Sequence, residues 1–283
     1  MVGKLVICPT PLGNLGDITK RCLQALEVCD VVCCEDTRVT GKLLSALGIE
    51  KRLERLDEAT ISHQASRIVD RIAKGETIAY CSDAGMPGVS DPGQRLIAAV
   101  YEAGQNVEVL PGGTAVATAY VASGFIAQSF YFGSFFPRKS GERMRLLESL
   151  RALEAVLVFY ESPQRLVSAL QDIASLLPFR KVAVCRELTK LHEEVVRGSA
   201  QELYEMFSER ENTGSLKGEI VLVIDAPCEQ EFISQKQEQE EDAQEIARKL
   251  LSEGTLTKKE IVSYLRRELG LSRNSAYDLV HNL

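Results

Sequence analysis

The stretch Thr77-Ile-Ala-Tyr-Cys81, followed directly by Ser82-Asp-Ala-Gly-Met-Pro-Gly-Val-Ser-Asp-Pro-Gly93, decides the fold class of this chain. The first part is a short apolar run of the kind that forms a buried strand. The second part is rich in glycine and proline, which expose backbone N–H groups and fix the shape of a loop. A strand that ends in such a loop is typical of α/β proteins, which bind ligands at the carboxyl edge of a sheet.

The same pattern recurs along the chain up to residue 225. Further apolar runs predict strands at Leu5–Cys8, Val31–Cys34, Val107–Leu110, Phe130–Gly133, Val156–Tyr160, Val182–Cys185 and Ile220–Ile224. Segments with an apolar period of 3.6 residues lie between them, as from Ala65 to Ala73. The alternation predicts an α/β fold with mainly parallel sheets.

The chain is expected to divide near Ser123–Gln128, where a helix ends and a new set of strands begins. This predicts an N-terminal α/β subdomain of residues 1–124 and a C-terminal α/β subdomain of residues 125–227, with a ligand cleft between them. The Gln- and Glu-rich residues 228–242 are predicted as an acidic linker or a polar helix face.

Residues 243–283 are predicted to form a small helical domain that resembles a helix-turn-helix. A capping box at Thr257 and Glu260 begins one helix, and Ser272 begins the next. A small bundle that serves packing or dimerisation is an equal alternative for this tail.

Composition constrains partners and location. The net charge of −7 argues mildly against nucleic acid, but six acidic residues and one lysine fall between Glu229 and Asp242, so the rest of the chain carries only −2. The eight cysteines lie mostly in predicted strands and lack metal-site spacing, which predicts buried thiols and no metal. No run of 18 apolar residues occurs, so we expect a cytoplasmic protein without a membrane span.

Other loops and charged segments also follow predicted strands. Glycine- and proline-rich loops occupy Cys8–Thr19 and Pro111–Ala115, and charged segments begin at Glu35, Phe159 and Arg186. The chain contains no G-x-G-x-x-G, no G-x-x-x-x-G-K-[ST] and no G-x-S-x-G, so the usual dinucleotide, phosphate-loop and serine-hydrolase sites are not supported.

Together these motifs resemble the ribosomal RNA small subunit methyltransferase I family, within the tetrapyrrole-methylase superfamily. The resemblance covers residues 4–226 in order, and the helical tail resembles the C-terminal domain of the family. The motifs that carry it are Thr10-Pro-Leu-Gly-Asn-Leu-Gly-Asp-Ile-Thr19, Glu35-Asp-Thr-Arg38, Ser82–Gly93, Leu110-Pro-Gly-Gly-Thr114 and Phe159-Tyr-Glu-Ser-Pro-Gln-Arg165.

The resemblance implies a homodimeric enzyme that uses S-adenosyl-L-methionine to methylate the 2′-oxygen of a cytidine in the decoding region of small-subunit (16S) ribosomal RNA. It also implies that the cofactor lies in the cleft between the subdomains. Carried over by motif, the cofactor-binding residues are Pro11, Asp83, Ala84, Gly85, Met86, Thr114, Ala115, Tyr160 and Glu161.

RNA binding requires cations for the phosphates, and aromatic rings can stack on bases. Arg38, Arg138, Lys139 and Arg165 are the predicted substrate-binding residues, with Arg143 and Arg145 as further candidates. Phe135 and Phe136 lie close by for base stacking.

A ribose hydroxyl is a poor nucleophile, so a base or an orienting cation is expected. We predict catalytic roles for Arg186, Glu187 and Lys190, with Lys190 held by Glu187. Burial beside a sulfonium is expected to lower the pKa of Lys190, so that it could accept the ribose proton or, if still charged, orient the hydroxyl. A surface Glu–Lys pair is the alternative.

Two other functions are open at this point. The first is methylation of a tetrapyrrole or a protein side chain, because the superfamily hosts these reactions on the same fold. The second is a nucleic-acid-binding protein without enzyme activity, in which the helical tail contacts the nucleic acid.

Overall fold

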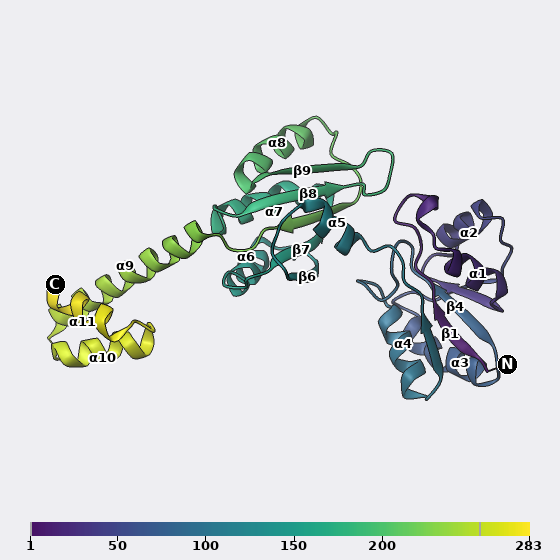
Figure 1. The fold of residues 1–283 in the computed structure, drawn as a ribbon, viewed down its shortest axis with the longest axis horizontal. Coiled ribbons are helices and arrows are strands. Elements are labelled where there is room, and N and C mark those ends of the chain that lie inside the picture. The colour runs from purple at the N-terminus through teal and green to yellow at the C-terminus, as the bar shows by residue number, and fades with distance from the viewer. Residues whose placement is uncertain (1, 255) are drawn as a thin grey trace. The chain divides into compact units, whose positions relative to one another are not determined.

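The computed structural model describes residues 2–254 and 256–283; the side chains of residues 62, 235–240 and 253 lie outside this description. The chain divides into two compact units, Met1–Ala226 and Pro227–Leu283 (Figure 1). Each unit has its own apolar core, and the candidate site belongs to the first.

The first half of unit 1 contains a parallel sheet in the strand order β3-β2-β4-β1-β5. Its strands are β1 (Lys4–Ile7), β2 (Val31–Cys34), β3 (Leu53–Arg55), β4 (Thr77–Cys81) and β5 (Asn106–Val109). The central strands are apolar along their length because helices cover both faces of a parallel sheet. Cys8, Cys34 and Cys81 are among the fully buried residues, which agrees with the expectation of buried thiols.

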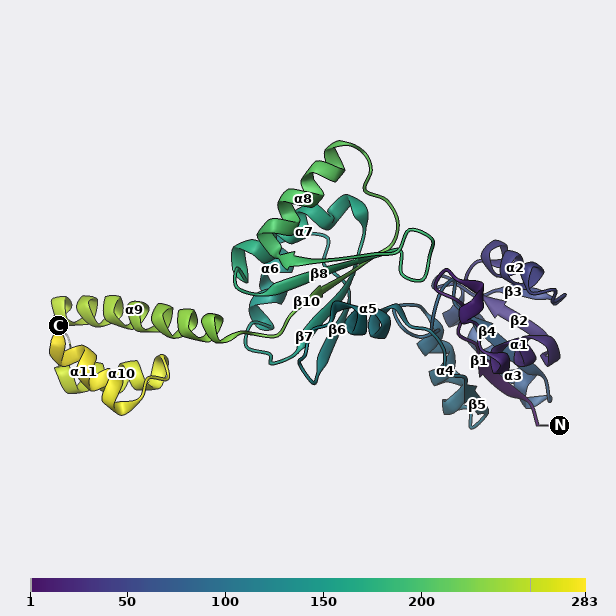
Figure 2. The same ribbon diagram turned by 45° about the horizontal axis from the view of Figure 1, so that its top comes forward.

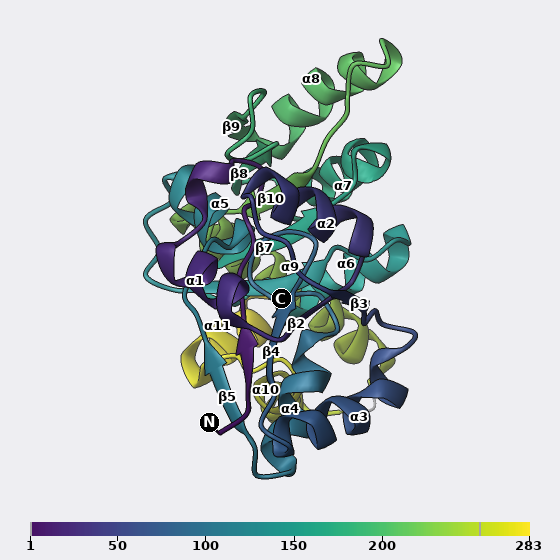
Figure 3. The ribbon, with the colours of Figure 1, turned by 90° about the vertical axis from the view of Figure 1, so that its right-hand side faces the viewer.

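The helices of this half lie on opposite faces of the sheet (Figures 1 and 3). Leu26 and Leu44 pack on one face, and Ile68 and Leu96 pack on the other. These helices are α1 (Lys20–Val28) and α2 (Thr37–Ala46) on the first face, α3 (Ile61–Ala73) and α4 (Gly93–Glu102) on the second, with a 3-10 turn η1 (Leu15–Asp17) before α1.

The second half of unit 1 contains a mixed sheet in the order β6-β7-β10-β8-β9. Its strands are β6 (Phe130–Phe135), β7 (Val156–Glu161), β8 (Lys181–Arg186), β9 (Glu194–Ser199) and β10 (Ile220–Ile224). Only β6 and β7 pair in parallel among these described strands, so the expectation of mainly parallel sheets is wrong here. The loop from β8 to β9 is too short for a parallel crossover, which needs about a dozen residues.

Helices cover both faces of this sheet as well (Figure 2). The helices α6 (Ser140–Ser149), α7 (Pro163–Leu176) and α8 (Ala200–Asn212) lie on one face, and α5 (Ala115–Ser123) lies on the other. Val116 and Ala119 of α5 pack against Val158 and Val221. The sequence placed α5 in the subdomain of residues 1–124, whereas its packing joins it to the second sheet.

Unit 2 is built from α9 (Glu229–Glu253), α10 (Lys258–Glu268) and α11 (Arg273–Asn282), with α10 and α11 against the later part of α9 (Figure 1). Its core contains Ala243, Ala247, Ile261, Leu265 and Val280. The capping box at Thr257 and Glu260 is confirmed. Residues 229–242, expected as an acidic linker or a polar helix face, form the first half of α9.

Across the described residues, no helix combines the length and the apolar content that a membrane crossing requires.

Candidate active site

The loops that follow β1 and β4 are joined by a pair of backbone hydrogen bonds. The N–H of Thr10 donates to the carbonyl oxygen of Gly85 at 2.9 Å, and the N–H of Gly85 donates to the carbonyl oxygen of Thr10 at 3.1 Å. Gly85 has φ of +78°, in the left-handed region that favours glycine. A Cβ atom here would lie 3.0 Å from Leu12 Cδ2 and 3.5 Å from the Gly113 carbonyl oxygen. Gly85 is therefore in contact with the loops that follow β1 and β5.

The loop after β5 also packs closely on the loop after β1. A Cβ atom on Gly112 would lie 2.4 Å from Pro9 Cβ, so only glycine allows this approach. Thr114 follows as the N-cap residue of α5. The three glycine- and proline-rich segments thus form one packed surface at the carboxyl edge of the first sheet.

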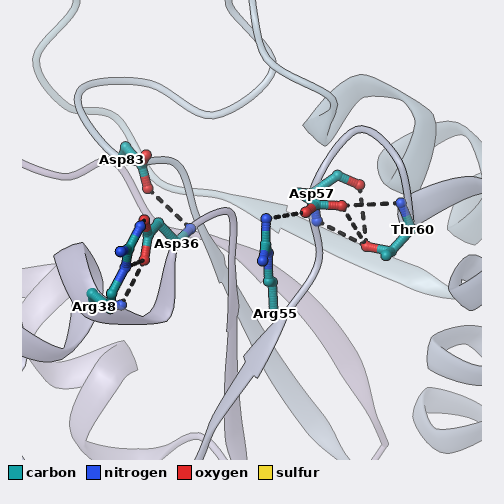
Figure 4. A network of polar contacts seen from close by, with 6 residues as sticks. All are labelled: Asp36, Arg38, Arg55, Asp57, Thr60 and Asp83. Carbon is teal, nitrogen blue, oxygen red and sulfur yellow. Dashed lines mark hydrogen bonds and ion pairs between the residues drawn. The ribbon is translucent and has the colours of Figure 1, made fainter.

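An acidic cluster joins the loops after β2 and β4, and Figure 4 shows its contact between Asp36 and Asp83. The N–H of Asp36 donates to Asp83 Oδ1 at 3.1 Å, and the N–H of Asp83 donates to Glu35 Oε1 at 3.1 Å. Burial raises the pKa of Glu35 to about 6, with smaller contributions from the carboxylates of Asp91 and Asp83. Burial also raises the pKa of Asp83, against the opposing hydrogen bond from Asp36. This edge of the site is therefore acidic and only partly solvated.

The second half contributes Tyr160 and Glu161 at the end of β7. The Glu161 side chain is fully buried, and its Oε1 accepts from the N–H of Ser162 and pairs with Arg165, both at 2.7 Å. Its Oε2 is buried and has no hydrogen-bond partner among the described residues. Burial raises the pKa of Glu161, although the bonds to Ser162 and Arg165 oppose this shift. An unpartnered acceptor in a buried carboxyl is costly unless a ligand donates to it.

These loops and strand ends line a cavity of about 410 Å³ between the two sheets of unit 1. All the expected cofactor residues except Pro11 line it. In place of Pro11, the next residue, Leu12, lines the cavity. The lining residues that were expected are Asp83, Ala84, Gly85, Met86, Thr114, Ala115, Tyr160 and Glu161.

Further lining residues were not expected, namely Glu35, Asp91, Gly218 and Glu219 among others. Phe135, which was expected for base stacking, also lines the cavity. Asp91 lies in the loop Ser82–Gly93, and Glu35 lies in the motif Glu35–Arg38, of which only Arg38 was predicted as a site residue. No signal in the sequence marked Gly218 and Glu219. They reach the cavity because β10 is antiparallel to β7 and β8, so its amino end meets their carboxyl ends.

Lys190 lies beside this cavity, in the loop after β8. Its Nζ contacts Glu187 Oε1 at 2.8 Å and Glu219 Oε2 at 3.1 Å. Its stem packs on the loop after β1, because a Cβ atom on Gly13 would lie 2.2 Å from Lys190 Cγ. Partial burial acts to lower the pKa of Lys190, but its hydrogen bonds to Glu187 and Glu219 outweigh burial and raise the pKa. The two carboxylates that hold the ammonium thus oppose the lowering of this pKa that was expected beside a sulfonium.

Glu187 and Arg186 are placed differently from each other. Glu187 Oε1 also accepts from the N–H of Glu219 at 2.8 Å, so it joins Lys190 to the lining of the cavity. Arg186 instead pairs with Glu194 at 3.0 Å and donates to the Lys217 carbonyl oxygen. None of the three predicted catalytic residues, Arg186, Glu187 and Lys190, is among the residues that line the cavity.

The expected substrate cations divide into exposed and structural residues. Arg38 is 85% exposed beside Asp36, and Lys139 is exposed next to Arg138 and pairs with Glu142 at 3.2 Å. Arg165 lies against Glu161, which occupies one side of its guanidinium.

Arg143, a further candidate, is buried against Asp172 at 2.6 Å and donates to the Pro137 and Arg138 carbonyl oxygens. Arg143 therefore stabilises the loop that carries Arg138 and Lys139 and does not itself face solvent.

A family model described as tetrapyrrole (corrin/porphyrin) methylases matches residues 4–204. A ribosomal RNA small subunit methyltransferase I from Bacillus subtilis is 34% identical over 281 residues, which cover 99% of this chain and 94% of that protein. The chain belongs to this methyltransferase family. Its relative of the same description in Halalkalibacterium halodurans is 40% identical over 223 residues, 79% of this chain and 76% of that protein.

A solved structure confirms the family fold. The crystal structure of diphthine synthase matches with a TM-score of 0.62 at 14% identity, over 78% of this chain and 90% of that chain. The fold with two α/β halves expected from the resemblance is thereby confirmed. The expected methyltransferase activity is confirmed by the family model and the relatives named above.

Proposed function

We propose that this enzyme transfers the methyl group of S-adenosyl-L-methionine to the 2′-oxygen of a cytidine in the decoding region of 16S ribosomal RNA. The observation that carries the proposal is the cavity between the two sheets, lined by the motif residues of a ribosomal RNA methyltransferase family. Methylation of a tetrapyrrole or a protein side chain is not favoured, because the relatives that match nearly the whole chain bear the ribosomal RNA description.

The residues present fit S-adenosyl-L-methionine. The cavity volume lies in the range of small-molecule sites. Its acidic lining, with Glu35, Asp83 and Asp91, suits a ligand that carries a sulfonium and an ammonium group. Glu161 Oε2 is an acceptor that awaits a donor such as a ribose hydroxyl, and Gly85 presents backbone atoms without a side chain to the lining of the cavity. We therefore assign the cofactor to this cavity, with Pro11 acting through the shape of its loop.

The bound cofactor supplies an activated methyl group, so the protein mainly has to align the acceptor oxygen with it. Glu161 and the backbone near Gly85 hold and orient the ligand. Lys190 keeps its proton, since its pKa is raised, and orients the acceptor hydroxyl or the adjoining phosphate. Glu187 holds Lys190 in place, and Arg186 braces the start of β9 through Glu194. Of the two roles expected for Lys190, we therefore propose the one in which it stays charged and orients the hydroxyl, and not the one in which it accepts the proton.

RNA contacts are assigned to exposed cations in both units. In unit 1 these are Arg38, Arg138 and Lys139. Arg165 contributes indirectly, because its ion pair holds the Glu161 carboxylate in place. In unit 2 the exposed Lys259 and Arg266 lie on α10 opposite the buried Ile261 and Leu265. Phosphate contacts of this kind position RNA without reading its sequence.

We also propose that two copies associate through the uncovered side of α5. This helix has no charged residue, and its Thr118 and Ser123 hydroxyls donate to carbonyl oxygens of the preceding turn. Such a composition is typical of helices that are covered on all sides. One side packs on the second sheet, whereas Val121 is 75% exposed and Ile126, just beyond the helix, is 96% exposed. A second copy is the occupant that the family resemblance implies, and we expect the dimer to act in the cytoplasm on ribosomal subunits.

The test is methyl transfer to small ribosomal subunits purified from a strain that lacks the enzyme. Labelled S-adenosyl-L-methionine should donate about one methyl group per subunit, and mapping should place it on a cytidine ribose in the decoding region. Transfer to a porphyrin or corrin precursor with no transfer to subunits would contradict the proposal.

A further inference from the structure

Consecutive aromatic residues in the first part of β6 point to alternate faces of the sheet. The ring of Tyr131 contacts Phe159 with 6.3 Å between centroids, and the ring of Phe132 contacts Tyr160 at 5.0 Å. Phe159 and Tyr160 are consecutive in β7 and so point to opposite faces of the sheet. A regular strand would therefore place Phe135 on the core face with Tyr131, and Phe136 on the face of Tyr160.

The structure shows the opposite arrangement, because β6 contains a bulge. The register with β7 shifts between Phe132 and Phe135, and Ser134 has φ of +59°. After the shift, Phe135 contacts Tyr160 at 5.4 Å, and Phe136 contacts Phe159 at 4.6 Å with 1% exposure. The bulge thus directs Phe135 to the cavity, and bulges often redirect a side chain beside an active site.

Both residues of the bulge are constrained by their surroundings. A Cβ atom on Gly133 would lie 2.2 Å from Phe159 Cε1, so the close approach requires glycine. Ser134 Oγ lies 2.8 Å from Oγ of Ser90, which lines the cavity and itself has φ of +68°. Left-handed conformations of residues other than glycine cost free energy and concentrate at functional sites. The position of Phe135 is therefore maintained from both halves of unit 1.

Phe135 is 57% exposed although it lines the cavity, so a large part of this residue is accessible to a ligand from outside. The edge contact with Tyr160 fixes its orientation. Arg138 and Lys139 follow in the loop that Arg143 holds through the Pro137 and Arg138 carbonyl oxygens. A rigid exposed ring followed by cations is the arrangement with which proteins bind an unstacked nucleotide.

We propose that Phe135 forms the stacking surface of a nucleobase subsite at the mouth of the cavity, where the base of the acceptor nucleotide lies while its ribose faces the methyl donor. This inference rests on the proposed function, since it assigns a residue to the RNA substrate of the same site. Phe135 is a substrate-binding residue in this proposal, and the other residues that line the cavity bind the cofactor.

Single-turnover methylation of small ribosomal subunits tests the subsite. Loss of a stacked base should lower the apparent affinity for subunits about 5- to 150-fold in Phe135→Ala. Phe135→Leu should show a similar loss, whereas Phe135→Tyr should remain within a few-fold of wild type. Cofactor affinity should be unchanged in all three. Tyr101→Ala, which removes a similarly exposed ring on α4, is the matched control and should behave as wild type. Wild-type kinetics in Phe135→Ala, or a loss of cofactor affinity, would overturn the inference.

A second measurement does not depend on turnover. The chain contains no tryptophan, so Phe135→Trp introduces a single indole at the proposed subsite. An RNA oligonucleotide with unpaired cytidines should quench its fluorescence, and S-adenosylhomocysteine alone should not. If wild type fails to methylate subunits, the proposed function fails, and this quenching decides the subsite by itself. Unchanged fluorescence at saturating oligonucleotide, or quenching by S-adenosylhomocysteine alone, would overturn it.

Discussion

Gly85 is the single residue at which a small change should affect the cavity most. Gly85→Val adds a branched side chain at φ of +78°, against Leu12 and the Gly113 carbonyl oxygen. We expect cofactor affinity to fall by about 5- to 150-fold, since strain of about 1–3 kcal/mol falls on the loops that bind it. Titration calorimetry measures this directly. Gly104→Val is the control, because Gly104 also has positive φ but open space around its Cβ position. Wild-type affinity in Gly85→Val would remove this loop from the cofactor site.

Lys190 should act as a permanent cation. Because its pKa is raised, it stays protonated from pH 6 to 9, and removal of an orienting donor costs on the order of 10²-fold in rate. Lys190→Ala should therefore lower the single-turnover rate by a similar factor at every pH in this range, with cofactor affinity unchanged. Lys4→Ala, which breaks the surface pair with Glu108, is the control. An ionisation below pH 9 that is present in wild type and absent in Lys190→Ala would instead identify Lys190 as the base.

Glu35 should make cofactor binding depend on pH. Burial raises its pKa to about 6, so the carboxyl is mostly neutral at pH 5 and mostly charged at pH 7. A charged carboxylate attracts a cationic ligand, and affinity should therefore rise with pH and level off above pH 7. Glu35→Gln keeps an acceptor for the Asp83 N–H and removes the ionisation. Calorimetry from pH 5 to 7.5 should show the rise in wild type and a flatter profile in the variant. Parallel profiles would assign the dependence to another group.

At the scale of elements, α10 should contribute phosphate contacts. Lys259 and Arg266 are exposed on one face of this helix, and the opposite face is in the core of unit 2. Replacing both with alanine should reduce the slope of log affinity against log salt by about 0.7–0.9 for each lost contact, so weaker RNA binding should accompany a shallower salt dependence. Filter binding to small subunits over a salt series measures both. An unchanged slope would leave α10 with a packing role only.

At the scale of the whole molecule, the uncovered side of α5 should determine the oligomeric state. Ile126→Asp places a charge at a position that a second copy would bury, and a buried unpaired charge is strongly destabilising to an interface. Light scattering coupled to size exclusion should show a dimer for wild type and half that mass for the variant. Val28→Asp, at the exposed end of α1, should leave the mass unchanged. A monomeric wild type would contradict the proposed dimer.

The sequence by itself determined the features that depend on local chemistry. The strands Val31–Cys34, Thr77–Cys81 and Ile220–Ile224 have the predicted bounds, because buried strands are apolar along their whole length. The capping box at Thr257 was also predictable, since both its partners lie within one helical turn. The glycine- and proline-rich loops after the strands predicted where a ligand binds, and the family resemblance supplied the individual lining residues.

Only the tertiary structure decided which charges and rings face the cavity. The pKa of Lys190 is raised by the nearby Glu187 and by Glu219, which is far along the chain. Glu219 reaches Lys190 from the start of an antiparallel strand that no local pattern distinguishes from a parallel one. Phe135 and Phe136 are alike in sequence, and a single bulge sends one to the cavity and the other to the core. Arg143 is withdrawn from the surface by Asp172 of a different helix. Each of these outcomes depends on contacts between segments that are distant in the sequence. The free energy that stabilises such contacts is available only once the whole fold has assembled.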